Sequence, residues 1–447
     1  MKQYYTDNLQ LYTILIIWLL VGMFGGPLIY VVLPISLLLM KKQERYEELL
    51  LGFLLILILS DSYDFHLHFA KSVKNIYISA LAIFFLMESG SFQPLNSIYK
   101  TFFPFFIISL YCLIFTETFS ISIQKTISYF LMYLIVPNYL VKLYRQHGAE
   151  VLKNIVFFMI TILIVSILCK YLLPNLANSG GRYRGVFGNP NGLGIFCLLS
   201  FLFFFVVNHI YKNLFDRFQL ILVYSIIMIS LLMSGSRNAI IGVLLFLFFQ
   251  KFYKMNPFLG FLVVLSVGYG AVLVENNLTT IISSLGLGGF FRIETLENGS
   301  GRYAAWFLAW NHIQENFFIG KGFDYDLYYM RSNWDLLSKM GHQGGVHNTF
   351  LSFWMNTGLI GLIIYLFAYF MTFLKAAKQN PLAFPILFVV TFTAFFESWL
   401  VGSLNPHTII FLMVLTLISD ESFYPEETKV SEEETEALLL EENGIKA

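Results

Sequence analysis

Long blocks of apolar residues alternate with short polar segments along almost the whole chain. Stretches such as FFMITILIVSILC and LGIFCLLSFLFFFVV contain no charged side chain. Runs of this kind predict transmembrane helices, because about 20 apolar residues in helical form cover the hydrocarbon core of a bilayer. The predicted spans centre on 10–24, 27–40, 49–60, 75–88, 102–117, 121–141, 153–173, 190–210, 218–233, 238–253, 257–274, 348–374, 382–399 and 407–419. The pattern therefore predicts an all-α polytopic membrane protein with roughly 12–14 transmembrane helices.

Composition supports this interpretation and excludes others. Hydrophobic residues make up 57% of the chain and charged residues only 13%, whereas soluble domains carry about 25% charged residues. The formal net charge is zero, so charge gives no reason to expect a nucleic-acid partner. Cys112, Cys169 and Cys197 lie in apolar runs without metal-ligand spacing, and no phosphate-binding loop is present. We therefore expect neither a metal nor a cofactor.

Lysine and arginine in the short loops predict the orientation. Most of these residues fall on one side of the predicted spans, which places the N-terminus in the cytoplasm. The other loops, with one long loop at 275–347, then face the periplasm or the cell exterior. We expect N-terminal membrane helices over 1–174, a core over 175–419 that includes the long loop, and an acidic cytoplasmic tail over 420–447.

The polar motifs on the predicted outer face share one property, which is that each lies where a helix begins. Asn189 precedes Pro190, Ser234 or Ser236 precedes Arg237, Ser300 precedes Arg302, and Asn405 precedes Pro406. These residue types cap helices or fit the first turn. The residues of interest in the motifs are Arg182, Arg184, Asn189, Asn191, Arg237, Arg302, His347 and Asn348.

Arginine in the first turn of a helix opposes the helix dipole, so its repeated placement there needs another reason. An anion bound at these helix starts would supply that reason, since arginine binds phosphate through paired N–H donors. We infer a diphosphate site ringed by Arg184, Arg237 and Arg302. The alternative is that each arginine only anchors the chain to lipid headgroups, and it applies most to Arg182. Glu397 is costly near a membrane and is expected to pair with an arginine, in a structural or a functional role.

The ordered motifs GNPNGLG, SGSR, SGRYAAW, GKG and HN followed by GLIG resemble the O-antigen ligase and O-antigen polymerase superfamily over roughly 180–375. The resemblance implies a GT-C-like membrane glycosyltransferase that acts on the periplasmic or extracellular face of the bacterial cytoplasmic membrane. It implies a glycan donor linked to undecaprenyl diphosphate, an acceptor glycan, and no metal or nucleotide. Arginines like Arg184 and Arg302 would engage the diphosphate, and a histidine like His347 would lie beside the acceptor hydroxyl.

Three alternatives bear on the function. Leu362 and Ile363 stand where ligases have a small polar pair, which favours a polymerase of O-antigen, capsule or exopolysaccharide units, with a chain-length regulator as a further partner. A ligase acting on lipid A–core stays open. A lipid-linked glycan transporter should carry charges at mid-membrane and show related halves.

His347 suits a general base, whereas Asn348 could cap its helix, orient His347 or contact a sugar.

Overall fold

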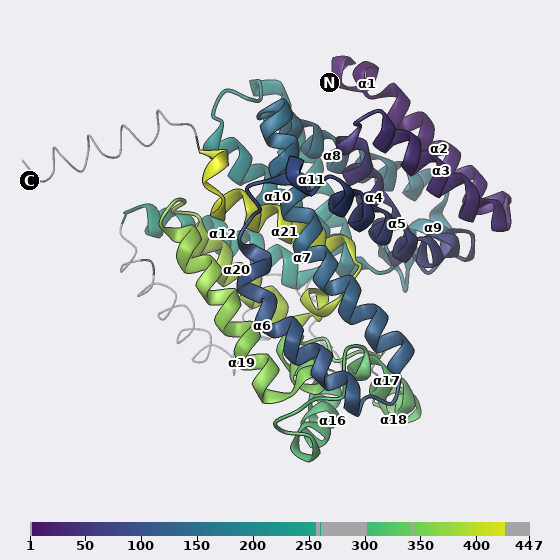
Figure 1. Cartoon of the computed structure of the whole chain (residues 1–447), viewed down its shortest axis with the longest axis vertical. Helices are drawn as coiled ribbons and strands as arrows, with labels where there is room; N and C mark the ends of the chain where they lie inside the picture. Colours follow the sequence, from purple (N-terminus) through teal and green to yellow (C-terminus); the bar gives the residue numbers. More distant parts are fainter. Residues whose placement is uncertain (1, 256–259, 261–301, 341–343, 425–447) are drawn as a thin grey trace, which may run out of the picture.

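The computed structural model describes residues 2–255, 260, 302–340 and 344–424. Each predicted span coincides with a long helix, except 257–274, which lies outside the described residues apart from Gly260. The long helices, drawn in Figure 1, are α2 (Leu9–Phe24), α3 (Ile29–Lys42), α4 (Tyr46–Asp61), α5 (His68–Met87), α6 (Ile98–Tyr111), α7 (Phe119–His147), α8 (Glu150–Leu172), α10 (Pro190–Ile210), α11 (Arg217–Ser234), α12 (Arg237–Met255), α19 (Thr349–Ala377), α20 (Ala383–Phe396) and α21 (Pro406–Ser419).

Shorter elements join these helices. The short helices are α1 (Lys2–Asp7), α9 (Pro174–Ala177), α16 (Arg302–Glu315), α17 (Tyr325–Ser332) and α18 (Trp334–Lys339). Short 3-10 turns occur at Gly26–Leu28, Phe65–Leu67, Ser89–Phe92, Cys112–Phe115, Trp399–Val401 and Glu421–Phe423. Strands β1 (Asn178–Ser179) and β2 (Arg182–Tyr183) form a small antiparallel hairpin. Helices α16, α17 and α18 gather at the lower end of the molecule in Figure 1.

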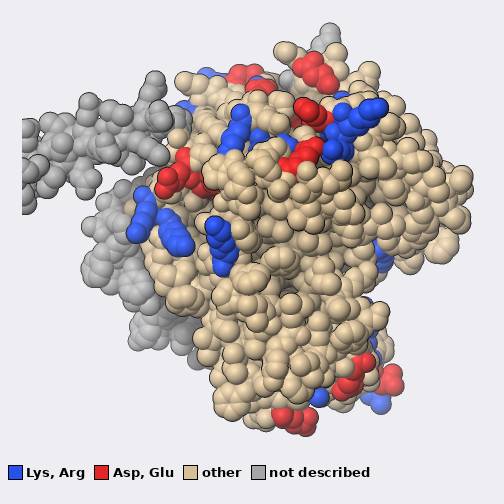
Figure 2. Space-filling model, in the orientation of Figure 1, with Lys and Arg blue, Asp and Glu red and all other residues tan. Residues whose placement is uncertain are grey.

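The chain is an all-α polytopic membrane protein. Among the described residues, seven helices are long and apolar enough to cross a bilayer: Phe65–Met87, Ile98–Phe115, Phe119–His147, Glu150–Leu172, Pro190–Ile210, Arg217–Ser234 and Thr349–Ala377. Charged side chains gather in an upper band and at the lower edge of the face in Figure 2, and the surface between them is almost entirely uncharged. An uncharged belt between two charged zones is what a bilayer requires of the surface that it surrounds.

The helices run back and forth between two ends of the bundle. One end is called the opposite end below. There Glu88 lies 2.9 Å from Lys41 and 3.3 Å from Lys142, and these contacts join the ends of α3, α5 and α7. At the other end, the site end, α4, α8, α11 and α20 finish and α10, α12, α19 and α21 begin. The predicted helix-start motifs within the described residues all lie at the site end.

Two of the membrane helices, α20 and α21, are shorter than a full crossing and bring polar groups inside the bundle at the site end. Helix α20 has 14 residues, which corresponds to about 21 Å, less than the ~30 Å of hydrocarbon that a full crossing requires. Helix α21 also has 14 residues. The loop between them, 397–405, is folded inward, and Glu397 is only 8% exposed. A carboxylate is therefore held within the bundle, below its end.

A break in α19 positions the start of that helix. Gly358 has φ 71°, and a Cβ added there would come within 2.3 Å of the Phe318 carbonyl oxygen. The segment after α16 lies against this break, since Leu359 N donates to Phe317 O at 2.9 Å and Gly322 N donates to Asn356 O at 2.8 Å. Only glycine fits both the positive φ and the close approach of the backbone. The GLIG motif thus fixes α16 and α19 relative to each other.

Candidate active site

Glu397 lies at the centre of a polar cluster made by three separate parts of the chain. Its Oε1 accepts hydrogen bonds from Asn191 Nδ2 and from an Arg302 terminal nitrogen, both at 2.8 Å. Its Oε2 lies 2.8 Å from Nδ1 of His347. These partners come from the start of α10, the start of α16 and the residues just before α19. The expected pairing of Glu397 with an arginine is confirmed by the Arg302 contact.

The cluster perturbs both of its titratable members. Burial by itself would lower the pKa of His347 and Arg302 lowers it further, but the Glu397 carboxylate outweighs both and the pKa is raised above 6.5. Burial would likewise raise the pKa of Glu397, yet His347 and Arg302 lower it to about 2. Glu397 is therefore ionised at any physiological pH. Because a carboxylate only accepts hydrogen bonds, the proton in the shared contact lies on Nδ1 of His347.

The backbone around His347 is held in a defined but strained form. His347 has φ 49°, in the left-handed region that non-glycine residues rarely occupy. The next residue, Asn348, caps α19 by accepting from Phe350 N at 2.9 Å and Leu351 N at 3.0 Å. Its own N–H donates to Ser398 Oγ at 2.9 Å. Of the roles considered for Asn348, the structure therefore shows that of a helix cap. The contact with Ser398 connects the start of α19 to the loop that carries Glu397.

Arg182 and Asn191 extend the cluster toward α11. One Arg182 terminal nitrogen donates to Asn191 Oδ1 at 3.2 Å and to the carbonyls of Ser234 and Gly235 at 3.0 and 3.1 Å. Asn191 therefore bridges Arg182 and Glu397. Asn189 caps α10 through a 2.8 Å bond from Gly192 N, as the sequence predicts. Arg182, the arginine that seemed closest to a simple surface anchor, is built into the site.

The remaining predicted arginines occupy separate positions. Arg184 donates from Nε to Leu176 O and from a terminal nitrogen to Gly188 O, each at 3.0 Å, so its guanidinium is held by its own loop. Arg237 begins α12, and Ser236 provides the first helical carbonyl, but the buried Ser236 hydroxyl makes no hydrogen bond among the described residues. Ser300, the expected cap of α16, lies outside the described residues, although α16 does begin at Arg302.

The cluster can be compared with known proteins once its members are placed. Residues 220–366 match the family model described as O-antigen ligase. Over these residues the chain is similar to the O-antigen ligase family, which supports the resemblance to the O-antigen ligase and polymerase superfamily. The O-antigen ligase segment includes Arg237, Arg302, His347 and Asn348, whereas Glu397 lies beyond it. No curated protein matches the chain.

Sequence reasoning identified the members of the cluster but missed how they connect. Ser398 carries no motif, and its contact with Asn348 depends on the inward fold of the loop after α20. The bridge through Asn191 joins residues 206 positions apart in sequence.

Among the described residues, no group of three or more His, Cys, Asp or Glu side chains is arranged to hold a metal ion. The O-antigen ligase match supports a ligase- or polymerase-type glycosyltransferase activity.

Proposed function

We propose that the protein moves a glycan from undecaprenyl diphosphate to an acceptor sugar hydroxyl at the outer face of the cytoplasmic membrane. The core over 175–419 would polymerise O-antigen, capsule or exopolysaccharide repeat units. The observation that carries the proposal is the Glu397 cluster, which joins a histidine, an arginine and a carboxylate at contacts of 2.8 Å. The O-antigen ligase match over 220–366 supports the same reaction class.

In this proposal His347 is the general base. Glu397 holds Nδ1 and stabilises the imidazolium that forms when Nε2 takes the acceptor proton. A Cβ added at Gly345 would lie 3.7 Å from Nε2, in ordinary van der Waals contact, and the backbone of Gly344 is a further hydrogen-bond partner of His347. The left-handed backbone at His347 fixes the direction of the ring as well.

The arginines would stabilise the departing diphosphate. As the acceptor oxygen bonds to the anomeric carbon, the bond from that carbon to the diphosphate oxygen breaks, and negative charge grows on the diphosphate. Arg302, with Arg184 and Arg237, supplies N–H donors and positive charge for it. Attack from the face opposite the leaving group inverts the anomeric configuration, and the chain's own cations do the work that a metal does in other enzymes.

The reaction can be separated from its alternatives with purified, reconstituted protein and a labelled undecaprenyl-diphosphate oligosaccharide. An enzyme releases undecaprenyl diphosphate, whereas a transporter moves the lipid intact. Product length then distinguishes a polymerase, which extends the glycan, from a ligase, which transfers it once to lipid A–core. Movement of intact lipid without release would contradict the proposal.

The pH dependence tests the role of His347. A base with a raised pKa loses activity as pH falls through a value above 6.5. A cationic diphosphate binder would instead lose activity as pH rises. The measurement is the initial rate against pH for wild type, His347→Ala and a control, His147→Ala, which changes an exposed histidine at the opposite end. We expect His347→Ala to fall by 10²–10⁴-fold, the usual contribution of a positioned base. Activity within a few-fold of wild type at every pH would contradict the assignment.

A further inference from the structure

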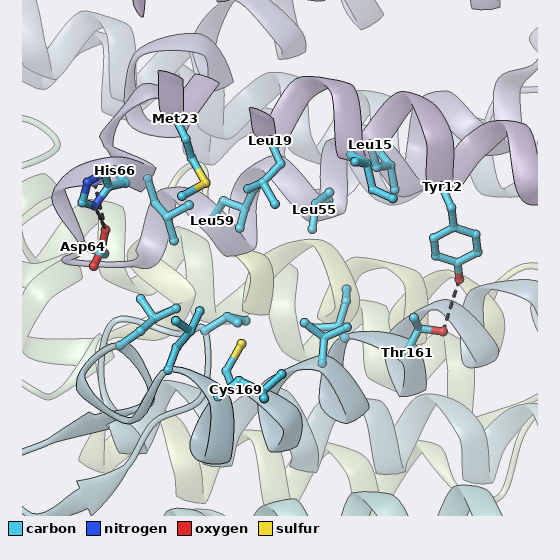
Figure 3. Close-up of a pocket in the computed structure, with 18 of the residues that line it drawn as sticks. Tyr12, Leu15, Leu19, Met23, Leu55, Leu59, Asp64, His66, Thr161 and Cys169 are labelled. Carbon is cyan, nitrogen blue, oxygen red and sulfur yellow. Dashed lines mark hydrogen bonds and ion pairs between the residues drawn. The ribbon is translucent and has the colours of Figure 1, made fainter. Parts of the chain in front are cut away.

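A cavity of about 860 Å³ lies between α2 and α8, away from the Glu397 cluster. Figure 3 shows Leu15, Leu19 and Met23 on α2 facing Cys169 on α8 across it. This volume lies toward the upper end of the range for small-molecule sites, which is roughly 300–1,000 Å³. Because the walls along its length are almost entirely apolar, the occupant along that length must be apolar too.

The shape of the cavity fits a chain-like molecule that enters from the bilayer. Tyr12 and Met23 lie near its two ends on α2, and the eleven helical steps from one to the other correspond to about 17 Å. That length is roughly half of the ~30 Å hydrocarbon core. Phe24 and Leu172 line the cavity and are 75% and 74% exposed, so one side is open and a lipid chain can enter laterally.

One end of the cavity is polar and carries a cation beside it. Asp64 and His66 lie there with their side chains 3.1 Å apart. The loop through Leu176 closes the same end, and Arg184 Nε donates to the Leu176 carbonyl at 3.0 Å. Arg184 does not line the cavity itself but contacts it through Leu176, and the Asp64 carboxylate at this end is already beside His66. A lipid with a hydrocarbon chain in the cavity and an anionic head would meet the Arg184 guanidinium just beyond the lining.

The mouth is joined to the Glu397 cluster by one short segment. Arg184 also donates to Gly188 O, and Gly188 precedes Asn191, which donates to Glu397. Three residues span at most roughly 11 Å of chain. A lipid whose chain lies in the cavity therefore has its head within reach of both Arg184 and the residues that carry the proposed chemistry.

We propose that this cavity binds the isoprenoid chain of the lipid-diphosphate donor, with Arg184 contacting the phosphate at its mouth. The inference rests on the proposed function, because the donor it names is the donor of that reaction. It gives Arg184 a role distinct from Arg302, since Arg184 would anchor the donor and Arg302 would act on the breaking bond.

Two tryptophan variants on the same helix test the assignment. Val165→Trp places a large side chain at a position that lines the cavity, whereas Leu168→Trp places it at a similarly exposed position outside the lining. Binding of undecaprenyl diphosphate and of isopentenyl diphosphate is measured by native mass spectrometry in nanodiscs. We expect Val165→Trp to weaken undecaprenyl diphosphate binding about tenfold relative to wild type and Leu168→Trp. Isopentenyl diphosphate has a single isoprene unit, which is too short to reach along the cavity, so it should bind all three proteins within a few-fold of one another.

The outcomes separate this inference from the proposed function. Equal binding of undecaprenyl diphosphate by the two variants, with glycan transfer intact, would contradict the cavity assignment alone. Phosphatidylglycerol is the second comparison. If it binds wild type as tightly as undecaprenyl diphosphate does, and Val165→Trp weakens both lipids equally, the cavity is a site for bulk phospholipid and the inference is overturned. Binding as expected, without release of undecaprenyl diphosphate from a glycan-carrying donor, would contradict the proposed function and leave the cavity assignment standing.

Discussion

Replacing Glu397 by glutamine removes the negative charge at the centre of the cluster and keeps the size of the side chain. The glutamine oxygen can still accept one hydrogen bond, but Arg302 and His347 both lose their charged partner. Glu397 is the strongest influence that raises the pKa of His347. The variant should therefore shift the titration of His347, and this shift can be measured in the dependence of activity on pH. That makes it a sharper test than the alanine variant of His347 itself.

The size of the effect follows from the carboxyl group. The pKa of Glu397 is lowered from 4.5 to about 2 because His347 and Arg302 outweigh the cost of burial, which corresponds to about 3 kcal/mol of net stabilisation of the carboxylate. If all of this were expressed in the transition state, kcat would fall by about two orders of magnitude. The carboxylate is ionised and its contribution is fully present above pH 4.5; it is lost only as pH falls toward 2.

The assay is the initial rate against pH in reconstituted protein. In wild type, the raised pKa of His347 predicts that activity falls on the acid side at a pH above 6.5. In Glu397→Gln, the lowering effects of burial and of Arg302 are no longer outweighed. The acid limb should therefore move to lower pH while the maximum rate drops.

Glu88→Gln is the matched control. Glu88 also has a pKa lowered to about 2 and pairs with Lys41 and Lys142, but it lies at the opposite end of the bundle. This variant should lose thermal stability without moving the acid limb. An acid limb that stays in place in Glu397→Gln, or moves to higher pH, would refute the assignment of His347 as a base oriented by Glu397.

Two further predictions concern the arginine cluster and the orientation of the chain. Arg302→Lys keeps a positive charge beside Glu397 but loses the planar fork, so kcat/KM should fall about thirtyfold, the effect of about 2 kcal/mol, while the acid limb stays in place. Arg145→Lys is the control, because Arg145 also uses both terminal nitrogens but lies at the opposite end. Its kcat/KM should stay near the wild-type value, and an equal loss of activity in both variants would mean that the effect comes from folding. In a Cys169→Ser background, a cysteine at Ser179 should react with an impermeant thiol reagent in whole cells, and one at Asn213 should not. Labelling at Asn213 alone would reverse the predicted orientation.

The sequence was sufficient for the elements and for most members of the site. Apolar runs predict helices directly, and Asn189 and Asn348 were recognisable as caps because their positions before apolar runs are local features. The arrangement was not predictable, because it depends on contacts between residues far apart in the chain. The diphosphate site ringed by Arg184, Arg237 and Arg302 stays a prediction, and the contacts of Arg184 with loop carbonyls and of Arg302 with Glu397 could not be read from the sequence.

The sharing of Glu397 explains how one cluster could serve both halves of the reaction. Arg302 uses one terminal nitrogen for Glu397, and a guanidinium has five N–H donors, so the same side chain can bind a diphosphate without releasing the carboxylate. As diphosphate leaves, the remaining N–H donors of Arg302 would stabilise the new negative charge while its contact with Glu397 is kept. At the same moment His347 gains the acceptor proton and draws more of the same carboxylate's charge through its 2.8 Å contact. Glu397 thus stays ionised between the two cations, holding Arg302 through one oxygen and the forming imidazolium through the other, and the cluster needs no large movement to serve both roles.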